Sequence, residues 1–147
     1  MMDFYYFEKL ERMQRRIHRK FLSEWNAISP MKLTIHQAIV LQTLARGGLH
    51  TVTELADIVC ISCGGLTILC DKLEEKGLVV RVRDETDRRL VNMQITDQGR
   101  KLVQSIVGLK GELVERMLDG LSTQDMSTLD SIYTKVLRNL GEQNGQA

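Results

Sequence analysis

Residues 51–77 read TVTELADIVCISCGGLTILCDKLEEKG, and they predict two short helices separated by only a few residues. Thr51 and Glu54 fit a capping box, in which the Thr hydroxyl accepts from an unpaired helix amide and the Glu carboxylate accepts from the cap amide. Ser62 is the next N-cap residue, and Gly77 ends the second helix. This segment therefore predicts two helices joined by a tight turn.

Helices are also predicted on the N-terminal side of this segment. Apolar residues recur every three or four positions from residue 3 to residue 28, which indicates one long amphipathic helix before Pro30, the sole proline. A second capping box at residues 34–37 begins a shorter helix, and the glycines at 47–48 end it. The order up to residue 77 is therefore one long helix followed by three short ones.

After Gly77 the apolar period changes from three or four residues to two. Val80 and Val82 alternate with arginines, residues 84–89 form a polar tip, and residues 91–95 alternate again. This pattern is typical of a two-stranded hairpin.

Two further helices are predicted after the hairpin. Thr96 caps a long helix that stops at Gly120, and Ser122 caps a last one. Residues 142–147 are expected to be a frayed tail.

The composition indicates one ordinary globular chain. It has 147 residues, 43% hydrophobic and 27% charged, with 20 basic and 19 acidic side chains, so bulk charge predicts no partner. The longest apolar runs are far shorter than the ~20 residues that cross a bilayer, and no signal-peptide pattern begins the chain. Three cysteines, an odd number, indicate reduced thiols. We therefore expect a cytoplasmic protein without a membrane partner.

Helix, helix, turn, helix and hairpin is the order of a winged helix-turn-helix. The segments LEEKGLV at 73–79, RDETDRR at 83–89 and ITDQG at 95–99 then make the chain resemble the MarR family of bacterial transcription regulators. The resemblance implies a mainly α fold with a small β-hairpin. It divides the chain into an N-terminal dimerisation helix (1–30), a winged helix-turn-helix DNA-binding domain (31–96) and C-terminal dimerisation helices (97–147).

The helix predicted after Ser62 is expected to lie in the major groove of double-stranded DNA. Its inward stripe is Leu66, Leu69, Cys70 and Leu73. The remaining side chains offer a hydroxyl that donates or accepts, an apolar contact for a thymine methyl and a cation for a phosphate or guanine. The expected DNA-contacting residues of this helix are Ser62, Cys63, Gly64, Gly65, Thr67, Ile68 and Lys72.

The two glycines at the start of this helix have two alternative interpretations. Gly64 and Gly65 either allow close approach of the helix start to a phosphate or are merely tolerated in a poorly formed first turn. The resemblance implies small polar or basic residues where this chain has Cys63 and Ile68, which predicts weaker reading of the bases.

The hairpin tip supplies the second expected DNA contact. The resemblance implies that Arg89 enters the minor groove while Asp87 holds its guanidinium, and Arg88 is expected to contact a phosphate. A narrow minor groove concentrates negative potential, which suits a planar cation. The alternative is a solvated turn with an incidental ion pair.

The apolar stripes of the terminal helices need a surface that buries them. We expect them to pack against a second copy of the chain and form a two-fold dimer, with an intramolecular bundle as the alternative. The expected dimerisation residues are Leu10, Met13, Ile17, Leu129, Tyr133, Val136, Leu137 and Leu140.

Other functions have weaker support in the sequence. The three histidines show no catalytic spacing, so no enzyme is predicted, and no cofactor. Cys60 and Cys63 lack the second ligand pair of a closed metal site, although a redox or metal response through them remains an alternative, as does a winged module that binds protein. The resemblance also implies a repressor that a small aromatic or anionic effector releases from a near-palindromic operator. Trp25, His36 and Arg16 are candidates for its crevice, and none is assigned.

Overall fold

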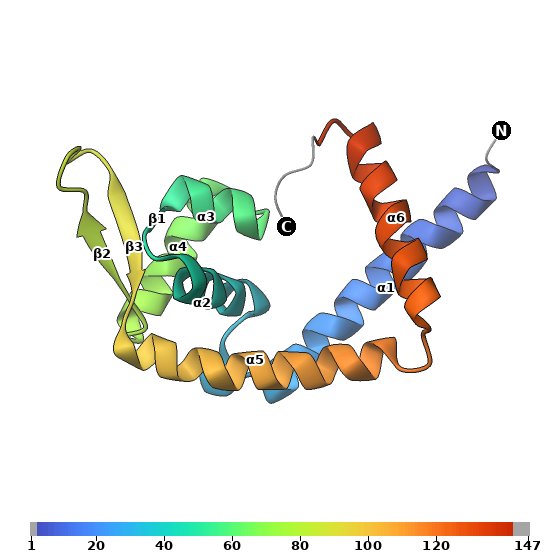
Figure 1. Cartoon of the computed structure of the whole chain (residues 1–147), viewed down its shortest axis with the longest axis horizontal. Helices are drawn as coiled ribbons and strands as arrows, with labels where there is room; N and C mark the ends of the chain where they lie inside the picture. Colours follow the sequence, from blue (N-terminus) through green and yellow to red (C-terminus); the bar gives the residue numbers. More distant parts are fainter. Residues whose placement is uncertain (1–2, 143–147) are drawn as a thin grey trace. The chain divides into compact units, whose positions relative to one another are not determined.

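The structure is a computed structural model that describes residues 3–142. Six α-helices and a three-stranded sheet make up this part of the chain (Figure 1). The elements are α1 (Phe4–Ile28), η1 (Pro30–Lys32), α2 (Ile35–Gly47), β1 (His50–Thr51), α3 (Val52–Val59), α4 (Cys63–Glu75), β2 (Val79–Arg83), β3 (Val91–Ile95), α5 (Asp97–Leu118) and α6 (Thr123–Asn139). The chain forms two compact units, Met1–Leu113 and Val114–Ala147. The predicted fold class is confirmed.

Side-chain caps begin the helices at the residues that the sequence predicts. Thr34 and Thr51 each form a complete capping box with the residue three positions later, at the starts of α2 and α3. Ser122 does the same before α6, with Asp125 as its partner. Ser62 Oγ accepts from the Gly65 amide at 3.1 Å and caps α4. The helix starts in this chain are therefore determined locally.

The sheet contains one strand that the sequence analysis missed. Its order is β1-β3-β2, all antiparallel, and β1 pairs His50 with Met93 and Thr51 with Asn92. A strand of two residues has no alternation to detect, and Thr51 is also the N-cap of α3. The predicted hairpin of β2 and β3 is confirmed, with Val79 opposite Ile95 and Arg83 opposite Val91.

The core of the first unit is built mainly from the winged segment. Its largest fully buried side chains include Leu41, Leu55, Leu66 and Met93. Trp25, near the end of α1, is also fully buried, and its indole N–H donates to the Leu33 carbonyl at 2.9 Å. This residue therefore anchors the end of α1 to the core. The full set of buried apolar residues is Trp25, Leu33, Ile35, Ala38, Val40, Leu41, Leu44, Leu55, Ala56, Val59, Leu66, Leu69, Cys70, Leu73, Leu78, Val79, Met93, Ile95, Ile106 and Leu113.

The start of α5 lies directly against the base of the hairpin. Thr96 donates from its hydroxyl to the Gly77 carbonyl at 2.7 Å and accepts from the Gly99 amide at 3.1 Å. A Cβ at Gly99 would lie 2.4 Å from the Leu78 carbonyl oxygen and 2.7 Å from the Ile95 side chain. The backbones therefore approach so closely that only glycine fits at this position.

Among residues 3–142, no single helix is long and apolar enough to cross a membrane. One pair, α3 with α4, meets the length and composition test together, but it is bent by 104° at its break.

Candidate nucleic-acid interface

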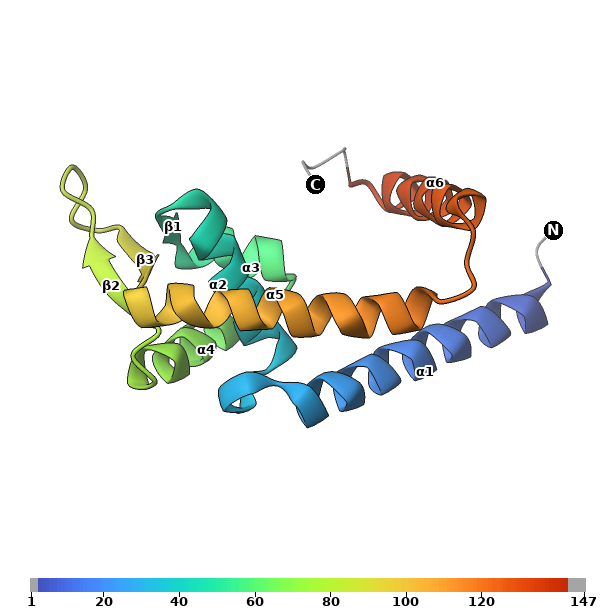
Figure 2. The ribbon, with the colours of Figure 1, turned by 60° about the horizontal axis from the view of Figure 1, so that its bottom comes forward.

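The inward stripe of α4 lies in the core and leaves one face of the helix in solvent. Leu66, Leu69, Cys70 and Leu73 are buried, as the sequence predicts. The residues expected to contact DNA are exposed, and Ile68 has 61% of its surface accessible. The β2–β3 hairpin extends beyond the helices of the same unit (Figure 2). Both elements therefore present free surfaces to an external partner.

The first turn of α4 is open on its outer side. A Cβ at Gly64 would meet nothing within 4 Å, so packing inside the chain does not require glycine there. At Gly65 a Cβ would lie 3.2 Å from the capping oxygen of Ser62. Gly64 therefore leaves space for an external group beside the free amides of the helix start, while Gly65 also protects the cap.

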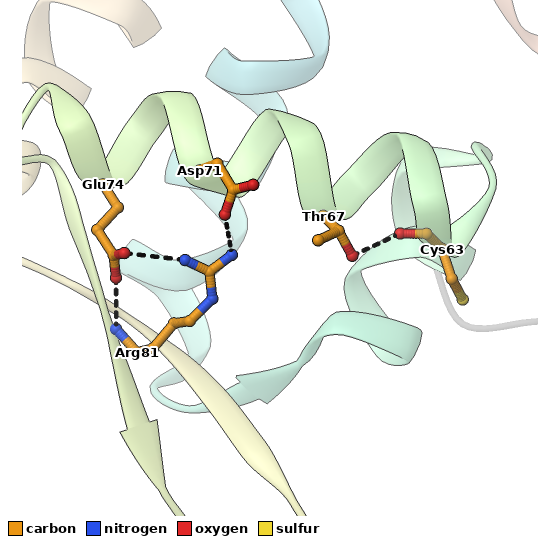
Figure 3. Close-up of polar contacts among 5 residues, drawn as sticks. All are labelled: Cys63, Thr67, Asp71, Glu74 and Arg81. Atoms are coloured by element: carbon orange, nitrogen blue, oxygen red, sulfur yellow. Dashed lines mark hydrogen bonds and ion pairs between the residues drawn. The ribbon is translucent and has the colours of Figure 1, made fainter.

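Thr67 has only part of the hydrogen-bonding capacity expected from the sequence. Its hydroxyl donates to the Cys63 carbonyl at 2.9 Å, one helical turn earlier (Figure 3). Since that bond uses its proton, the exposed oxygen of Thr67 presents acceptor lone pairs to a partner.

Arg81 of β2 bonds to two carboxylates on α4, an arrangement that the sequence analysis did not identify (Figure 3). Its guanidinium lies 2.5 Å from Asp71 Oδ1 and 2.9 Å from Glu74 Oε1. Its backbone amide also donates to Glu74 Oε2 at 3.2 Å. From the strand pattern, Arg81 was predicted only to be a polar residue of the hairpin. The sequence signal for this contact was the pair of acidic residues, three positions apart, on the exposed face of α4.

Asp84 organises the loop at the tip of the hairpin. Its Oδ1 accepts from the Thr86 hydroxyl at 2.6 Å, the Thr86 amide at 2.8 Å and the Asp87 amide at 3.0 Å. These hydrogen bonds, with that from the Thr86 hydroxyl the largest cause, lower the pKa of Asp84 to about 2. The carboxylate is therefore ionised and holds the loop at neutral pH.

Asp87 differs in geometry from what the resemblance implies. Its carboxylate accepts from the backbone amide of Arg89 at 3.0 Å, rather than from the guanidinium. Arg88 and Arg89 are both exposed. Asp87 therefore shapes the backbone that carries Arg89 and leaves the guanidinium available for a partner.

The three cysteines are free thiols in different environments. Cys60 and Cys63 are exposed, and Cys70 is buried. Cys60 has a left-handed backbone with φ of 60° as the C-cap of α3, and its thiol donates weakly to the Asp57 carbonyl at 3.6 Å. Burial raises the pKa of the Cys70 thiol, which disfavours the reactive thiolate. Within the described residues, no three His, Cys, Asp or Glu side chains form a group that holds a metal ion.

The residues expected to dimerise are exposed in the single chain. On α1 these are Leu10, Met13 and Ile17, and α1 buries only Trp25. On α6, Leu129, Tyr133, Val136 and Leu137 are exposed, as is its C-cap residue Leu140, and no residue of this helix is buried. Both helices therefore carry apolar stripes that the single chain leaves in solvent.

A partly buried cation lies between α2 and α5. Lys110 Nζ donates to Gln42 Oε1 at 3.2 Å. Burial and then the nearby Arg46 guanidinium lower the pKa of Lys110, because both disfavour its charged form. The expected crevice residues differ from this pair: Trp25 is core, His36 is half-buried and Arg16 is exposed.

The fold, the exposed face of α4 and the hairpin are those of a winged helix-turn-helix protein. The profile of the MarR family matches residues 33–91. Two proteins of Bacillus subtilis are similar in sequence. The HTH-type transcriptional regulator YpoP is 28% identical, over 86% of this chain and 90% of the relative. The HTH-type transcriptional repressor MdtR is 27% identical, over 71% of this chain and 67% of the relative. The structure of a cysteine-to-serine mutant of MarR from E. coli complexed with operator DNA is similar with a TM-score of 0.81 and 27% identity, covering 92% of this chain and 99% of that one. The chain is therefore similar to MarR-type transcriptional regulators, which are not enzymes.

Proposed function

We propose that this chain binds double-stranded DNA as a homodimer and represses transcription from a near-palindromic operator. The observation that carries the proposal is the exposed face of α4 beside an ordered hairpin that presents two free arginines. Similarity to the operator-bound MarR structure over 92% of this chain supports the same use of these elements. The proposed roles are DNA binding by residues 31–96 and dimerisation by residues 1–30 and 97–147.

In this proposal α4 enters the major groove. Ser62, Cys63, Gly64 and Gly65 lie at the helix start, where free amides and a surface without side chains suit a phosphate. Thr67 accepts from a base amino group and Ile68 contacts a thymine methyl, while Lys72 contacts a phosphate or guanine. With a single cation among these residues, the helix contributes placed contacts rather than a broad positive field.

The hairpin tip enters the adjacent minor groove. Arg89 is the residue proposed to enter it, Arg88 contacts a phosphate, and Asp87 orients the backbone between them. The hydrogen bonds of Asp84 keep the loop ordered before DNA arrives, so less conformational entropy is lost on binding.

The terminal helices are proposed to supply the dimer. Their exposed apolar side chains include Leu10, Met13, Ile17, Leu129, Tyr133, Val136, Leu137 and Leu140. Contiguous apolar surface of this kind is unfavourable in water and typical of interfaces. A two-fold dimer would place its two α4 helices in half-sites one helical turn apart, roughly 34 Å.

Release from DNA is proposed to follow binding of a small aromatic anion near Lys110. This cation is partly buried, Arg46 adds a second positive charge, and neither forms a salt bridge with a carboxylate of the described residues. An anion would therefore be favoured there. Benzoate that releases the operator, with benzamide of the same shape inactive, is the expected result; equal effects of the two would contradict an anion site.

The DNA-binding proposal is tested by footprinting and titration of genomic fragments that the protein selects. Two protected half-sites and a dimer mass by light scattering are expected. Arg89→Ala should weaken operator binding by about 1–3 kcal/mol at fixed salt with the fold intact, since the side chain is exposed. Arg100→Ala, which removes an exposed arginine from α5, is the matched control and should bind as wild type.

Three outcomes would contradict this proposal. Protection of one half-site by a species of single-chain mass would contradict the dimer. Wild-type affinity of Arg89→Ala would remove the minor-groove role. Absence of salt-sensitive DNA binding would instead favour a winged module that binds another protein.

A further inference from the structure

We propose that Arg81 is a positioning residue that fixes the hairpin to α4, so that the two DNA-binding elements meet the operator in one relative geometry. This inference rests on the proposed function. It assigns a role to a residue that contacts no base itself and that acts through Asp71 and Glu74 (Figure 3).

The geometry constrains both the backbone and the side chain of Arg81. The guanidinium Nη2 and Nη1 reach Asp71 Oδ1 at 2.5 Å and Glu74 Oε1 at 2.9 Å. The backbone amide of the same residue donates to Glu74 Oε2 at 3.2 Å. Asp71 and Glu74 lie three residues apart and are therefore neighbours on the surface of α4. One residue of the strand is thus joined to one turn of the helix by three hydrogen bonds.

Because of where Arg81 lies on β2, its bonds to α4 restrict the movement of the hairpin. Arg81 pairs with Met93 of β3, which is fully buried and holds the base of the hairpin in the core. Beyond Asn92, the next residue toward the tip and also buried, the hairpin leaves the core, and Arg89 is carried on its exposed loop. The bonds from Arg81 to α4 therefore act where the hairpin leaves the core, and they limit how it swings relative to the helix.

Arg81 bonds to two carboxylates at once, unlike the cation of an isolated surface ion pair. Its side chain and those of its partners are nevertheless partly accessible to solvent, as in such a pair. The side chain of Arg81 is 29% accessible, and those of Asp71 and Glu74 are 51% and 42% accessible. Exposed ion pairs typically contribute about 0–1 kcal/mol to stability. We therefore expect Arg81 to affect DNA binding more than folding. Arg is required rather than Lys, because only a planar fork reaches two carboxylates at once.

Charge repulsion and the positioning role predict opposite effects on DNA binding when Asp71 or Glu74 is removed. Asp71 and Glu74 lie on the exposed side of α4, and each negative charge repels DNA phosphates. Removing one should tighten binding if charge were all that mattered. If Glu74 instead positions the hairpin through Arg81, its removal should weaken binding. The sign of the effect therefore separates the two roles.

The first experiment measures operator affinity and melting temperature for Arg81→Met, Arg81→Lys and Glu74→Ala. Loss of about tenfold in affinity is expected for Arg81→Met and Glu74→Ala, with a smaller loss for Arg81→Lys and nearly unchanged melting temperatures. Should Arg81→Met fail to fold, Arg81→Lys and Glu74→Ala still test the inference. Tighter binding by Glu74→Ala, or wild-type affinity of the Arg81 variants, would overturn it.

The second experiment is a double-mutant cycle between Arg81→Met and Arg89→Ala. If Arg81 places the hairpin, Arg89→Ala should cost less affinity in the Arg81→Met background than in wild type. Additive losses would overturn positioning. The slope of log affinity against log salt should also stay unchanged in Arg81→Met, whereas a phosphate contact would reduce it by about 0.9.

Failure of this inference is distinguishable from failure of the proposed function. If wild type binds its operator and Arg89→Ala weakens that binding while Arg81→Met and Glu74→Ala do not, only the role of Arg81 is wrong. If wild type shows no salt-sensitive DNA binding, the proposed function fails first, and the inference fails with it.

Discussion

The helices of the winged segment (residues 31–96) and the terminal helices carry apolar residues at the same helical spacing. They differ in what covers those apolar residues. Most buried apolar side chains of the described chain lie between Leu33 and Ile95. In contrast, α1 buries only Trp25, and α6 buries no residue at all. Leu140 and Ile17 keep 78% and 55% of their surface accessible. A helical stripe of apolar residues therefore predicts that a surface will be buried, without indicating whether the same chain buries it.

The largest expected effect comes from placing a charge in the apolar stripe of α6. Leu137→Glu should give single-chain or aggregated species and more than about 100-fold weaker operator binding, because burying an unpaired carboxylate in a dimer interface is costly. Light scattering and operator titration measure the two effects. The winged core should keep its melting transition, since Leu137 is exposed in the single chain.

Ser131→Glu is the matched control for this variant. Ser131 is exposed on the same helix and outside the apolar stripe, and the substitution adds the same charge. It should leave a dimer that binds the operator. A Leu137→Glu protein that stays dimeric would show that α6 does not form the interface, and the comparison between the two regions would lose its explanation.

The second prediction concerns the junction where the start of α5 packs against the winged segment. Gly99→Ala should destabilise the fold by about 1–3 kcal/mol, because overpacking forces the backbone or its neighbours to move. The added Cβ would lie 2.4 Å from the Leu78 carbonyl oxygen. Thermal or urea unfolding measures the free energy of unfolding.

Gly108→Ala on the same helix provides the contrast for Gly99→Ala. A Cβ at Gly108 meets nothing within 4 Å, so alanine should stabilise α5 by about 0.5–1 kcal/mol. Equal effects of the two substitutions would mean that the close approach at Gly99 does not constrain the fold.

The sequence predicted local features better than long-range ones. The caps at Thr34, Thr51, Ser62 and Ser122 were predictable because each needs only a few neighbouring residues. The contacts of Arg81 with Asp71 and Glu74 were not predictable by the same means, since they depend on how the strand packs across the helix.

The hairpin tip illustrates the same limit at short range. The polar segment at residues 84–89 predicted a turn, and the turn is present. However, Asp84 rather than Asp87 accepts most of the hydrogen bonds that order it. Composition indicates that carboxylates stabilise such a loop, but the choice among them depends on backbone geometry.

The third prediction concerns that loop and its dependence on pH. The pKa of Asp84 is lowered to about 2, below its unfolded value, so its contribution to loop order is present above the unfolded pKa and is lost as pH falls toward 2. NMR titration of the Thr86 and Asp87 amides should therefore show a midpoint near 2 rather than near 4. A midpoint near 4 would contradict the hydrogen bonds.

At neutral pH, Asp84→Asn should weaken operator binding by less than Arg89→Ala, because the loop loses order while its arginines remain. Glu85→Gln is the matched control, since it removes the same charge from the next residue. If charge alone mattered, both variants would bind more tightly, because each removes a negative charge that repels DNA phosphates. Weaker binding by Asp84→Asn alone would show that loop order outweighs charge, and equal tightening would show the reverse.

The smallest expected effect is at Cys63, in the exposed first turn of α4. Cys70, in contrast, is buried, and burial raises the pKa of its thiol and disfavours the reactive thiolate. Cys60 is exposed as well, on a left-handed C-cap that determines its backbone. If small, weakly polar side chains merely suit the turn and the groove, Cys63→Ser should keep operator affinity within about tenfold. Mild peroxide should then leave wild-type protein on its operator. Release by peroxide that dithiothreitol reverses, and that Cys63→Ser abolishes, would instead make this turn a redox sensor within the DNA-binding surface.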